Sequence, residues 1–302
     1  MVIQTQNLTK QFNGKGGFAN ISLSVREGEV FSFLGKNGAG KSTFVRTLLG
    51  ILHPTSGEGM ILGKSIGNVE VRKEIGYLPE LFQYQNWLTG YELLFNHGLL
   101  YKMDKKDIKN RIEEVLLIIG LKGHEKKKLK EYSKGMKQRI GLGCAIISNP
   151  KILFLDEPTS ALDPVGRKQV RDIISDLKNQ GKTIFLNTHL LSEVEMISDR
   201  VAILDKGQIK KVGTMDELIY SPVMVSVENI NDKIINDLKK IDPMVNILNN
   251  NIEIHVEDKT IPKVVNTIVK NDGLLYMIKR KENALEELFI NTVGEADERW
   301  VQ

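Results

Sequence analysis

Residues 35 to 43 read Gly35-Lys36-Asn37-Gly38-Ala39-Gly40-Lys41-Ser42-Thr43. An apolar run, 30–34, precedes this stretch, and a helical stretch, 44–49, follows it. A strand, a glycine-rich loop that closes on Gly-Lys-Ser and a helix, in that order, form a phosphate-binding loop. The glycines let backbone N–H groups point at phosphate oxygens, and the helix N-terminus adds positive potential. The stretch therefore predicts an α/β protein that binds nucleotide phosphates.

The residues of this loop are expected to divide the work between them. Lys41 should reach the β- and γ-phosphates, and Ser42 should supply a hydroxyl ligand to Mg²⁺. The backbone cradle comes from Gly35, Asn37, Gly38, Ala39, Gly40 and Thr43. An incidental glycine-rich turn is the competing interpretation, and the flanking strand and helix disfavour it.

A pair of carboxylates ends a second apolar run farther along the chain. The run 152–155 is followed by Asp156 and Glu157. Asp156, at the carboxyl edge of a strand, can hold Mg²⁺ through water, because hard cations prefer oxygen ligands. Glu157 can polarise an attacking water without competing for the metal. Alone, the pair is a moderate signal, since such a sequence often simply ends a strand; after a phosphate-binding loop it becomes a strong one.

Three further segments complete an ordered set of motifs. Tyr132-Ser133-Lys134-Gly135-Met136 precedes the acidic pair, and Ser160-Ala161-Leu162-Asp163 and Thr188-His189 follow it. The set resembles the nucleotide-binding subunit of an ABC transporter, over roughly residues 1–220. The resemblance implies ATP and Mg²⁺ as cofactors and ATP hydrolysis as the activity.

The resemblance also implies roles for single residues. Residues 132–136 become the signature segment, 160–163 with Asp163 the D-loop, and His189 the histidine that contacts the γ-phosphate. Phe12 is the candidate for the aromatic that stacks on adenine, with Phe18 as its competitor. A core or strand-end position is the alternative interpretation of Phe12.

The signature segment indicates that two copies act together. Ser133 and Gly135 open a helix whose amide dipoles would face the γ-phosphate held by the partner's loop. ATP would then join a head-to-tail pair, made with a second copy or a paralogous ATPase subunit. A C₂ pair has two equivalent sites. The resemblance adds separate transmembrane permease subunits as partners, of the exporter type.

Two places in the chain, the signature segment and residue 80, depart from the commonest form of this family. The signature segment has Tyr132, Lys134 and Met136 in place of Leu, Gly and Gln. Lys134 is either a favourable extra charge or a solvated surface lysine. Glu80 stands where the family usually has a glutamine that touches Mg²⁺ and water. Its carboxylate can still coordinate the ion, but it places another negative charge beside the phosphates.

The pattern along the chain predicts the fold class and two domains. Alternating strand-like and helix-like stretches indicate a mostly parallel sheet with helices on both faces, and short strands before about residue 28 indicate a small antiparallel sheet. We expect an ABC ATPase domain at 1–220, with a helical subdomain at about 87–140. Residues 221–302 predict an accessory α+β domain of ferredoxin-like βαββαβ order, whose hairpin turns at 249–251.

Composition limits the classes of protein. The chain has 302 residues, with 42 basic and 38 acidic side chains and a net charge of +4. This weak bias argues against nucleic acid as a partner. A single cysteine, Cys144, fits a reducing compartment. The start lacks a secretory signal, and no apolar run approaches the ~18 residues of a membrane helix. The expected location is cytoplasmic, peripheral on the inner face of the membrane through permease subunits.

Two weaker features lie near the signature segment. Lysines at 126–128 and 130 could meet lipid headgroups or an acidic partner loop, although such a run is more often solvated. Trp87, Leu88 and Tyr91 open the helical insertion, where the resemblance places the docking groove for a coupling helix of the membrane subunit. Core packing of the insertion is the alternative for these three side chains.

Two other functions compete with a transport ATPase. A soluble ABC-type ATPase acting on nucleic acid or ribosomes is disfavoured, because the chain has one phosphate loop and no long heptad run. A different phosphate-loop enzyme, such as a kinase or GTPase, does not account for Ser133-Lys134-Gly135, Asp156-Glu157 and His189 in this order.

The expected reaction is in-line attack of water on the γ-phosphate of Mg·ATP. Lys41 and the loop amides stabilise charge, while Glu157 polarises the water and His189 positions the γ-phosphate. The metal ligands are Ser42, Asp156 and Glu80.

Overall fold

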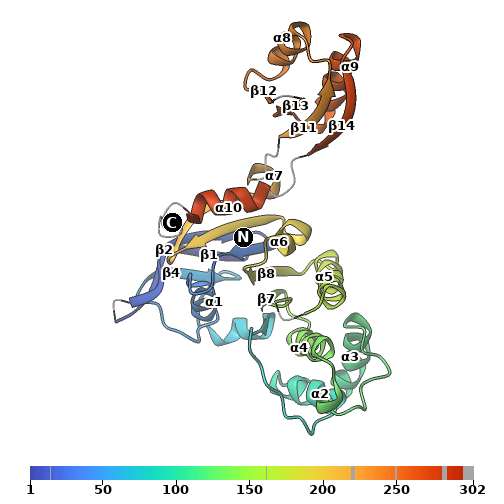
Figure 1. Ribbon diagram of the computed structural model, residues 1–302. Helices are drawn as coiled ribbons and strands as arrows, with labels where there is room; N and C mark the ends of the chain where they lie inside the picture. Colours follow the sequence, from blue (N-terminus) through green and yellow to red (C-terminus); the bar gives the residue numbers. More distant parts are fainter. Residues whose placement is uncertain (14, 161, 219–221, 249, 281–283, 295–302) are drawn as a thin grey trace, which may run out of the picture. The chain divides into compact units, whose positions relative to one another are not determined.

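The computed structural model describes residues 1–13, 15–160, 162–218, 222–248, 250–280 and 284–294 (Figure 1). Contacts within the chain divide it into two compact units, Met1–Met215 and Asp216–Gln302. The predicted domain boundary at 220/221, the D-loop residue Ala161 and the hairpin residue Asn249 lie outside the described residues.

A six-stranded sheet forms the centre of the first unit, in the order β10-β9-β3-β8-β7-β6. All neighbouring strands from β9 to β6 are parallel, and only β10 is antiparallel to its neighbour. The strands are β3 (Val30–Leu34), β6 (Ile75–Leu78), β7 (Ile152–Asp156), β8 (Thr183–Thr188), β9 (Arg200–Asp205) and β10 (Gln208–Thr214). The predicted mostly parallel sheet is confirmed.

Alternate residues of a strand point to opposite faces of the sheet. The residues of β3, β7 and β8 are all buried, so both faces of the sheet are covered. On one face, phenylalanines of β3, β7 and β8 form a buried cluster with Phe44 of α1 (Lys41–Leu48). On the other face, leucines and isoleucines of β7 and β8 pack with α4 (Lys134–Ile146) and α5 (Pro164–Asn179). A short helix, α6 (Leu191–Ile197), follows β8.

An antiparallel sheet in the order β2-β1-β4-β5 completes this unit, as predicted. Its strands are β1 (Ile3–Phe12), β2 (Lys15–Val25), β4 (Ser56–Ile61) and β5 (Lys64–Ser65). The expectation of short strands is wrong, because β1 and β2 have 10 and 11 residues. Asn7, with φ 48°, lies at a register shift between Thr5 and Leu8. A bulge there lets β1 continue through the register shift.

The helical insertion lies between β6 and β7. It contains α2 (Gly90–Leu100), α3 (Lys105–Ile118), the short 3₁₀ helix Leu129–Glu131 and α4, while another 3₁₀ helix, Val69–Glu74, precedes β6. A capping box starts α2, in which Thr89 and Glu92 satisfy each other's backbone N–H groups. None of the helices among the described residues is long and apolar enough to cross a membrane.

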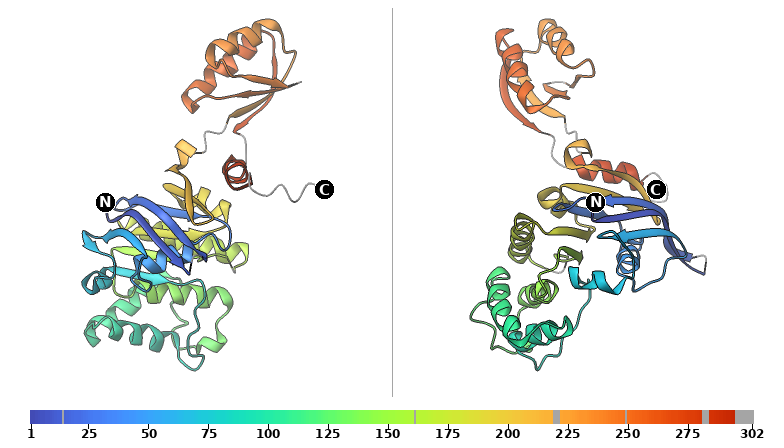
Figure 2. Two further views of the ribbon diagram at one scale, coloured as in Figure 1. Left: turned by 90° about the vertical axis from the view of Figure 1, so that its left-hand side faces the viewer. Right: turned by 180° about the vertical axis from the view of Figure 1, so that it is seen from behind.

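The second unit contains a four-stranded antiparallel sheet in the order β12-β13-β11-β14 (Figure 2). This is the strand order of the predicted ferredoxin-like fold. Apolar side chains of β11 and β13 pack against those of α8 and α9 in one core. The elements are α7 (Met215–Leu218, at the junction), β11 (Val223–Glu228), α8 (Asp232–Ile241), β12 (Asn246–Leu248), β13 (Asn251–Ile254), a 3₁₀ helix (Asp258–Thr260), α9 (Ile261–Lys270), β14 (Leu274–Arg280) and α10 (Ala284–Gly294).

Candidate nucleotide-binding and catalytic site

The loop between β3 and α1 forms one wall of a pocket. The pocket is lined by Gly17, Asn37, Gly38, Gly40, Lys41, Ser42, Thr43, Glu80 and Glu157. Gly38 and Gly40 have φ of 83° and 104°, a region that glycine adopts at no steric cost. Six of the eight loop residues predicted to bind phosphate or metal therefore line one pocket with Glu80 and Glu157.

Two residues of the loop, Gly35 and Ala39, do not line the pocket. A Cβ on Gly35 would approach the backbone oxygen of Leu204 to 2.5 Å, so only glycine fits there. Ala39 is buried, and its carbonyl accepts a hydrogen bond from the N–H of Gly207 at 3.0 Å. Both residues hold the loop against the end of β9 and the turn that follows it.

The ammonium group of Lys41 is held over the loop. Its Nζ donates to the carbonyl of Gly35 at 2.7 Å and to that of Lys36 at 3.3 Å, and it lies 3.5 Å from Oε1 of Glu157. The side chain is only 6% exposed. Lys41 therefore places one positive charge at the centre of the pocket, where charge-assisted hydrogen bonds to phosphate oxygens are strongest.

Asp156 and Ser42 form the candidate metal site. Oγ of Ser42 donates to Oδ1 of Asp156 at 3.2 Å, and Nδ2 of Asn187 donates to the same oxygen at 3.1 Å. Burial raises the pKa of the Asp156 carboxyl, against hydrogen bonds from Asn187 and Ser42 that lower it. Its Oδ2 is buried without a hydrogen-bond partner among the described residues. An unsatisfied carboxylate oxygen beside a hydroxyl fits Mg²⁺, which prefers such hard oxygen ligands.

Glu157 and His189 meet at the edge of the pocket. Nδ1 of His189 lies 2.9 Å from Oε1 of Glu157, and the hydroxyl of Thr188 donates to Oε2 at 3.4 Å. Glu157 has φ 51°, a left-handed conformation that costs a non-glycine residue about 1–3 kcal/mol. Its N–H donates to the carbonyl of Asn187 at 2.9 Å, which holds that conformation. The carboxylate is thereby aimed into the pocket, where it can accept a proton from water.

The signature residues lie in a different pocket. That pocket is lined by Ser133, Lys134, Gly135, Arg139, Leu162, Asp163, Val165, Gly166 and Gln169. Ser133 caps α4 by accepting from the N–H of Met136 at 3.2 Å, and Asp163 caps α5 by accepting from the N–H of Gly166 at 2.7 Å. The predicted site residues thus fall into two groups, one around the loop and one around these two helix N-termini.

The two aromatic candidates for adenine stacking differ in exposure. Phe18 is 2% exposed and packs edge-on against Phe44, with ring centroids 5.1 Å apart, so it belongs to the core. Phe12 is 44% exposed at the end of β1, with Nζ of Lys10 5.2 Å above its ring. Phe12 does not line the loop pocket, and its adenine contact stays a prediction.

Sequence reasoning missed Gly17 and Asn187. Gly17 reaches the loop pocket from β2, and a Cβ there would meet the backbone oxygen of Lys10 at 1.9 Å. The Gly16-Gly17 pair was the only signal for that close approach. Asn187 is a fully buried polar residue at the carboxyl end of β8, beside Asp156 in the next strand. A polar side chain ending an apolar strand could have marked it.

Known proteins are similar to this chain in sequence and fold. The family model for ABC transporters matches residues 18–160. An uncharacterized ABC transporter ATP-binding protein of Synechocystis is 46% identical over 201 residues, which cover 66% of this chain and 57% of that protein. YhcH of Bacillus subtilis, an uncharacterized ABC transporter ATP-binding protein, is 34% identical over 98% of this chain and 97% of its own.

Two further comparisons extend the likeness. The bacitracin transport ATP-binding protein BcrA of Enterococcus faecalis is 32% identical over 97% of this chain and 96% of its own. A solved ATP-binding subunit of an ABC transporter superposes with a TM-score of 0.65 at 27% identity, over 72% of this chain and 92% of that one. The chain spans only 57% and 63% of the length of two cyanobacterial relatives.

The fold of the first unit is that of an ATP-binding cassette. The chain belongs to the family of ABC transporter ATP-binding proteins.

Proposed function

We propose that this chain binds and hydrolyses ATP to power a separate membrane permease, and that it acts as a head-to-tail dimer. One observation carries the proposal: the loop pocket and the signature pocket lie on one chain but have no lining residue in common. Lys41 and Ser42 can bind a phosphate and its metal ion, and Glu157 can activate water. Ser133 and Gly135, however, do not line that pocket. A second copy turned by a C₂ axis would bring each signature segment to the partner's loop.

The chemistry of the proposed site follows from its charges. Lys41 and the N–H groups of the loop would bind the β- and γ-phosphates, as amides at a helix N-terminus do for anions. Mg²⁺, when bound by Ser42, Asp156 and Glu80, would neutralise phosphate charge. Glu157 would accept the proton of the attacking water. His189, in contact with Glu157, would position the γ-phosphate.

The partner across the dimer is a second copy or a paralogous ATPase subunit, and the cargo is moved by separate transmembrane subunits. We propose export as the direction, because the chain resembles single-cassette subunits of exporters and is similar to BcrA over nearly its whole length. The proposed location is the cytoplasmic face of the membrane. No nucleic acid takes part in this function.

A surface on the helical insertion is suited to the permease. Trp87 is 70% exposed, and Leu100 is exposed beside it in a pocket that also contains Leu88 and Tyr84. Large exposed aromatic side chains are favoured as anchors in protein interfaces. Tyr91 instead stacks on Phe95, with ring centroids 6.0 Å apart. We propose Trp87 as the anchor for a coupling helix and Tyr91 as a packing residue.

The test is recovery of partners by tagged Glu157→Gln protein from detergent-solubilised native membranes, with ATP and without it. Recovery of a multi-spanning membrane protein with ATP supports the proposal and identifies the permease. Recovery of ribosomes or nucleic acid without a membrane partner would leave ATP hydrolysis standing and overturn the transport function. The untagged Glu157→Gln chain serves as the control for non-specific membrane proteins.

A further inference from the structure

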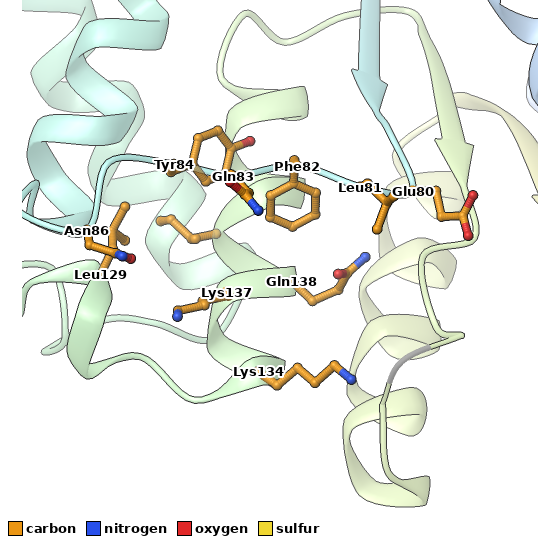
Figure 3. A pocket seen from close by; sticks show the side chains of 11 residues that line it. Glu80, Leu81, Phe82, Gln83, Tyr84, Asn86, Leu129, Lys134, Lys137 and Gln138 are labelled. Carbon is orange, nitrogen blue, oxygen red and sulfur yellow. The ribbon is translucent and has the colours of Figure 1, made fainter.

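Glu80 is a charged side chain without a partner at the edge of the nucleotide pocket. It lies two residues after the end of β6 and is exposed, and it lines both the loop pocket and the pocket shown in Figure 3. It makes no hydrogen bond or ion pair with any described residue. The loop pocket is therefore lined by two carboxylates, Glu80 and Glu157, and by one cation, Lys41. For a pocket that receives phosphates, this charge balance is unfavourable.

Lys134 is a charged side chain without a partner at the edge of the signature pocket. It is the first residue of α4, it is exposed, and it stands between Ser133 and Gly135. Within the described chain it forms neither a hydrogen bond nor an ion pair. The signature pocket is lined by two cations, Lys134 and Arg139, and by Asp163, whose carboxylate already caps α5. The two pockets therefore carry opposite net charge.

Of the three cations that line the two pockets, Arg139 and Lys41 have partners within the described chain. Lys134 has none there and can therefore pair with a group on a second copy. Nη1 of Arg139 donates to the carbonyls of Ile119 and Gly120 at 3.0 and 2.8 Å. Lys41 is held by the carbonyl of Gly35 and by Glu157. Figure 3 shows the Glu80 carboxylate at the end of the strand and the Lys134 ammonium at the start of the helix.

We infer that Lys134 of one copy pairs with Glu80 of the other across the shared nucleotide. The inference rests on the proposed head-to-tail dimer, in which Ser133 and Gly135 face the partner's loop, so that Lys134 between them enters the pocket that Glu80 lines. A carboxylate has two oxygens, so Glu80 can face Mg²⁺ with one and accept from Lys134 with the other. Lys134 is thus a positioning residue: it offsets the charge of Glu80 and favours the dimer in which ATP is enclosed.

The test is a double-mutant cycle on the ATP-bound dimer. All chains carry Glu157→Gln, and the dissociation constant of the dimer is measured by analytical ultracentrifugation with saturating Mg·ATP. Lys134→Gln should weaken the dimer about tenfold when residue 80 is Glu, but only about threefold in the Glu80→Gln chain. The difference should shrink as salt is raised, because exposed charges are screened.

Lys137→Gln is the matched control, since Lys137 lies one turn farther along α4 and lines the pocket of Figure 3 but not the signature pocket. It should change the dissociation constant by the same factor in both backgrounds. Equal factors for Lys134→Gln in the two backgrounds would overturn the pair and leave the proposed function untouched. A Glu157→Gln parent that stays monomeric with ATP would overturn the proposed dimer and this inference together.

A second measurement separates pairing between copies from pairing within one chain, since both residues also line one pocket of the same copy. The chain has one cysteine, Cys144, which is buried with its thiol pKa raised to about 12 by burial, so it does not compete for reagents. A Glu80→Cys/Lys134→Cys chain treated with a short bis-maleimide should give a covalent dimer only with ATP. An intramolecular product alone would contradict the inference.

Discussion

Nδ1 of His189 lies 2.9 Å from Oε1 of Glu157. Glu157 directly follows β7 and His189 directly follows β8, which are neighbours in the parallel sheet. Parallel strands end at the same edge, so two residues far apart in sequence come together there. The same oxygen of Glu157 lies 3.5 Å from Nζ of Lys41. One carboxylate thereby lies between the lysine proposed to bind the phosphates and the histidine proposed to position the γ-phosphate.

Replacing Glu157 by Gln should stop hydrolysis while ATP binding remains. The amide keeps the size of the side chain but cannot accept the proton of water, so turnover should fall by about 10²–10⁴-fold. Phosphate release measures turnover, and gel filtration with ATP should show a dimer that persists. Glu113→Gln, on the exposed side of α3, is the control and should leave both unchanged. Ordinary turnover in the Glu157→Gln chain would show that another group accepts the proton.

A methyl group added at Gly135 should spare the fold and disrupt the dimer. A Cβ there would meet no atom within 4 Å, and Ala in place of Gly favours a helix by about 0.5–1 kcal/mol. The melting temperature should therefore hold or rise slightly. The ATP-dependent dimer should be lost, because the methyl group would occupy the space that the partner's phosphate needs. Gel filtration of Glu157→Gln/Gly135→Ala with ATP tests this.

Gly76→Ala in β6 is the control variant for Gly135→Ala. A Cβ at Gly76 would lie 2.0 Å from the backbone oxygen of Ala145, and the backbone would have to move. Overpacking of this kind costs about 1–3 kcal/mol or more. Gly76→Ala should lower stability measurably, whereas Gly135→Ala should not. Equal losses of stability would mean that Gly135 is required by the fold rather than by a partner.

The sequence was informative where the chemistry is local. The phosphate-binding loop occupies nine consecutive residues, and Asp156 and Glu157 are adjacent, so spacing alone predicted them. The ferredoxin-like order of the second unit also followed from a simple alternation of strands and helices, and its strand order agrees. Each of these predictions depends on residues that lie close together along the chain.

The site residues that the sequence did not predict come from segments far apart along the chain that the fold brings together. Gly17 enters the loop pocket from β2, and Asn187 reaches Asp156 from the next strand. β1 continues through a register shift at Asn7, whose φ is positive, and the short strands expected from the sequence did not allow for that irregularity.

Removing the exposed indole of Trp87 should separate ATP hydrolysis from permease binding. The side chain is exposed, so Trp87→Ala should change stability by less than about 0.5 kcal/mol and leave soluble ATPase activity intact. Recovery of the membrane partner should fall at least about tenfold, as expected for an aromatic anchor. Met244→Ala, at another exposed apolar position in the second unit, is the control. Undiminished recovery would show that the permease docks elsewhere.

The helical insertion should lose stability as pH falls, through His97. Burial on α2 lowers the pKa of His97, whose ring packs edge-on against Tyr84 with centroids 5.8 Å apart. Between that lowered pKa and about 6.5, the unfolded chain binds more protons than the folded one, so stability rises with pH in this window. Acidification from above 6.5 through the window should lower the melting temperature, by roughly 1–3 °C more than in His97→Gln. Parallel pH profiles for the two chains would contradict this role.

Loss of the ring of Phe185 should destabilise the first unit and loosen the loop together. This side chain is fully buried on β8, and its ring lies within 6.0 Å of the rings of Phe31, Phe33, Phe44 and Phe154. Truncation to Ala should cost about 3–5 kcal/mol, measured by urea unfolding. Tyr276→Ala, at an exposed position on β14, should cost far less in the same assay.

The same substitution should weaken nucleotide binding, because Phe44 follows Lys41, Ser42 and Thr43 on α1 and packs directly on Phe185. A helix that can shift no longer holds its N–H groups at fixed positions around a phosphate. The dissociation constant for Mg·ATP, measured in buffer where the Phe185→Ala chain is folded, should rise. Phe154→Ala removes a ring of the same cluster that has no ring contact with Phe44, so it should match the loss of stability with a smaller loss of affinity. If both variants lost affinity equally, the effect would come from general softening of the core rather than from α1.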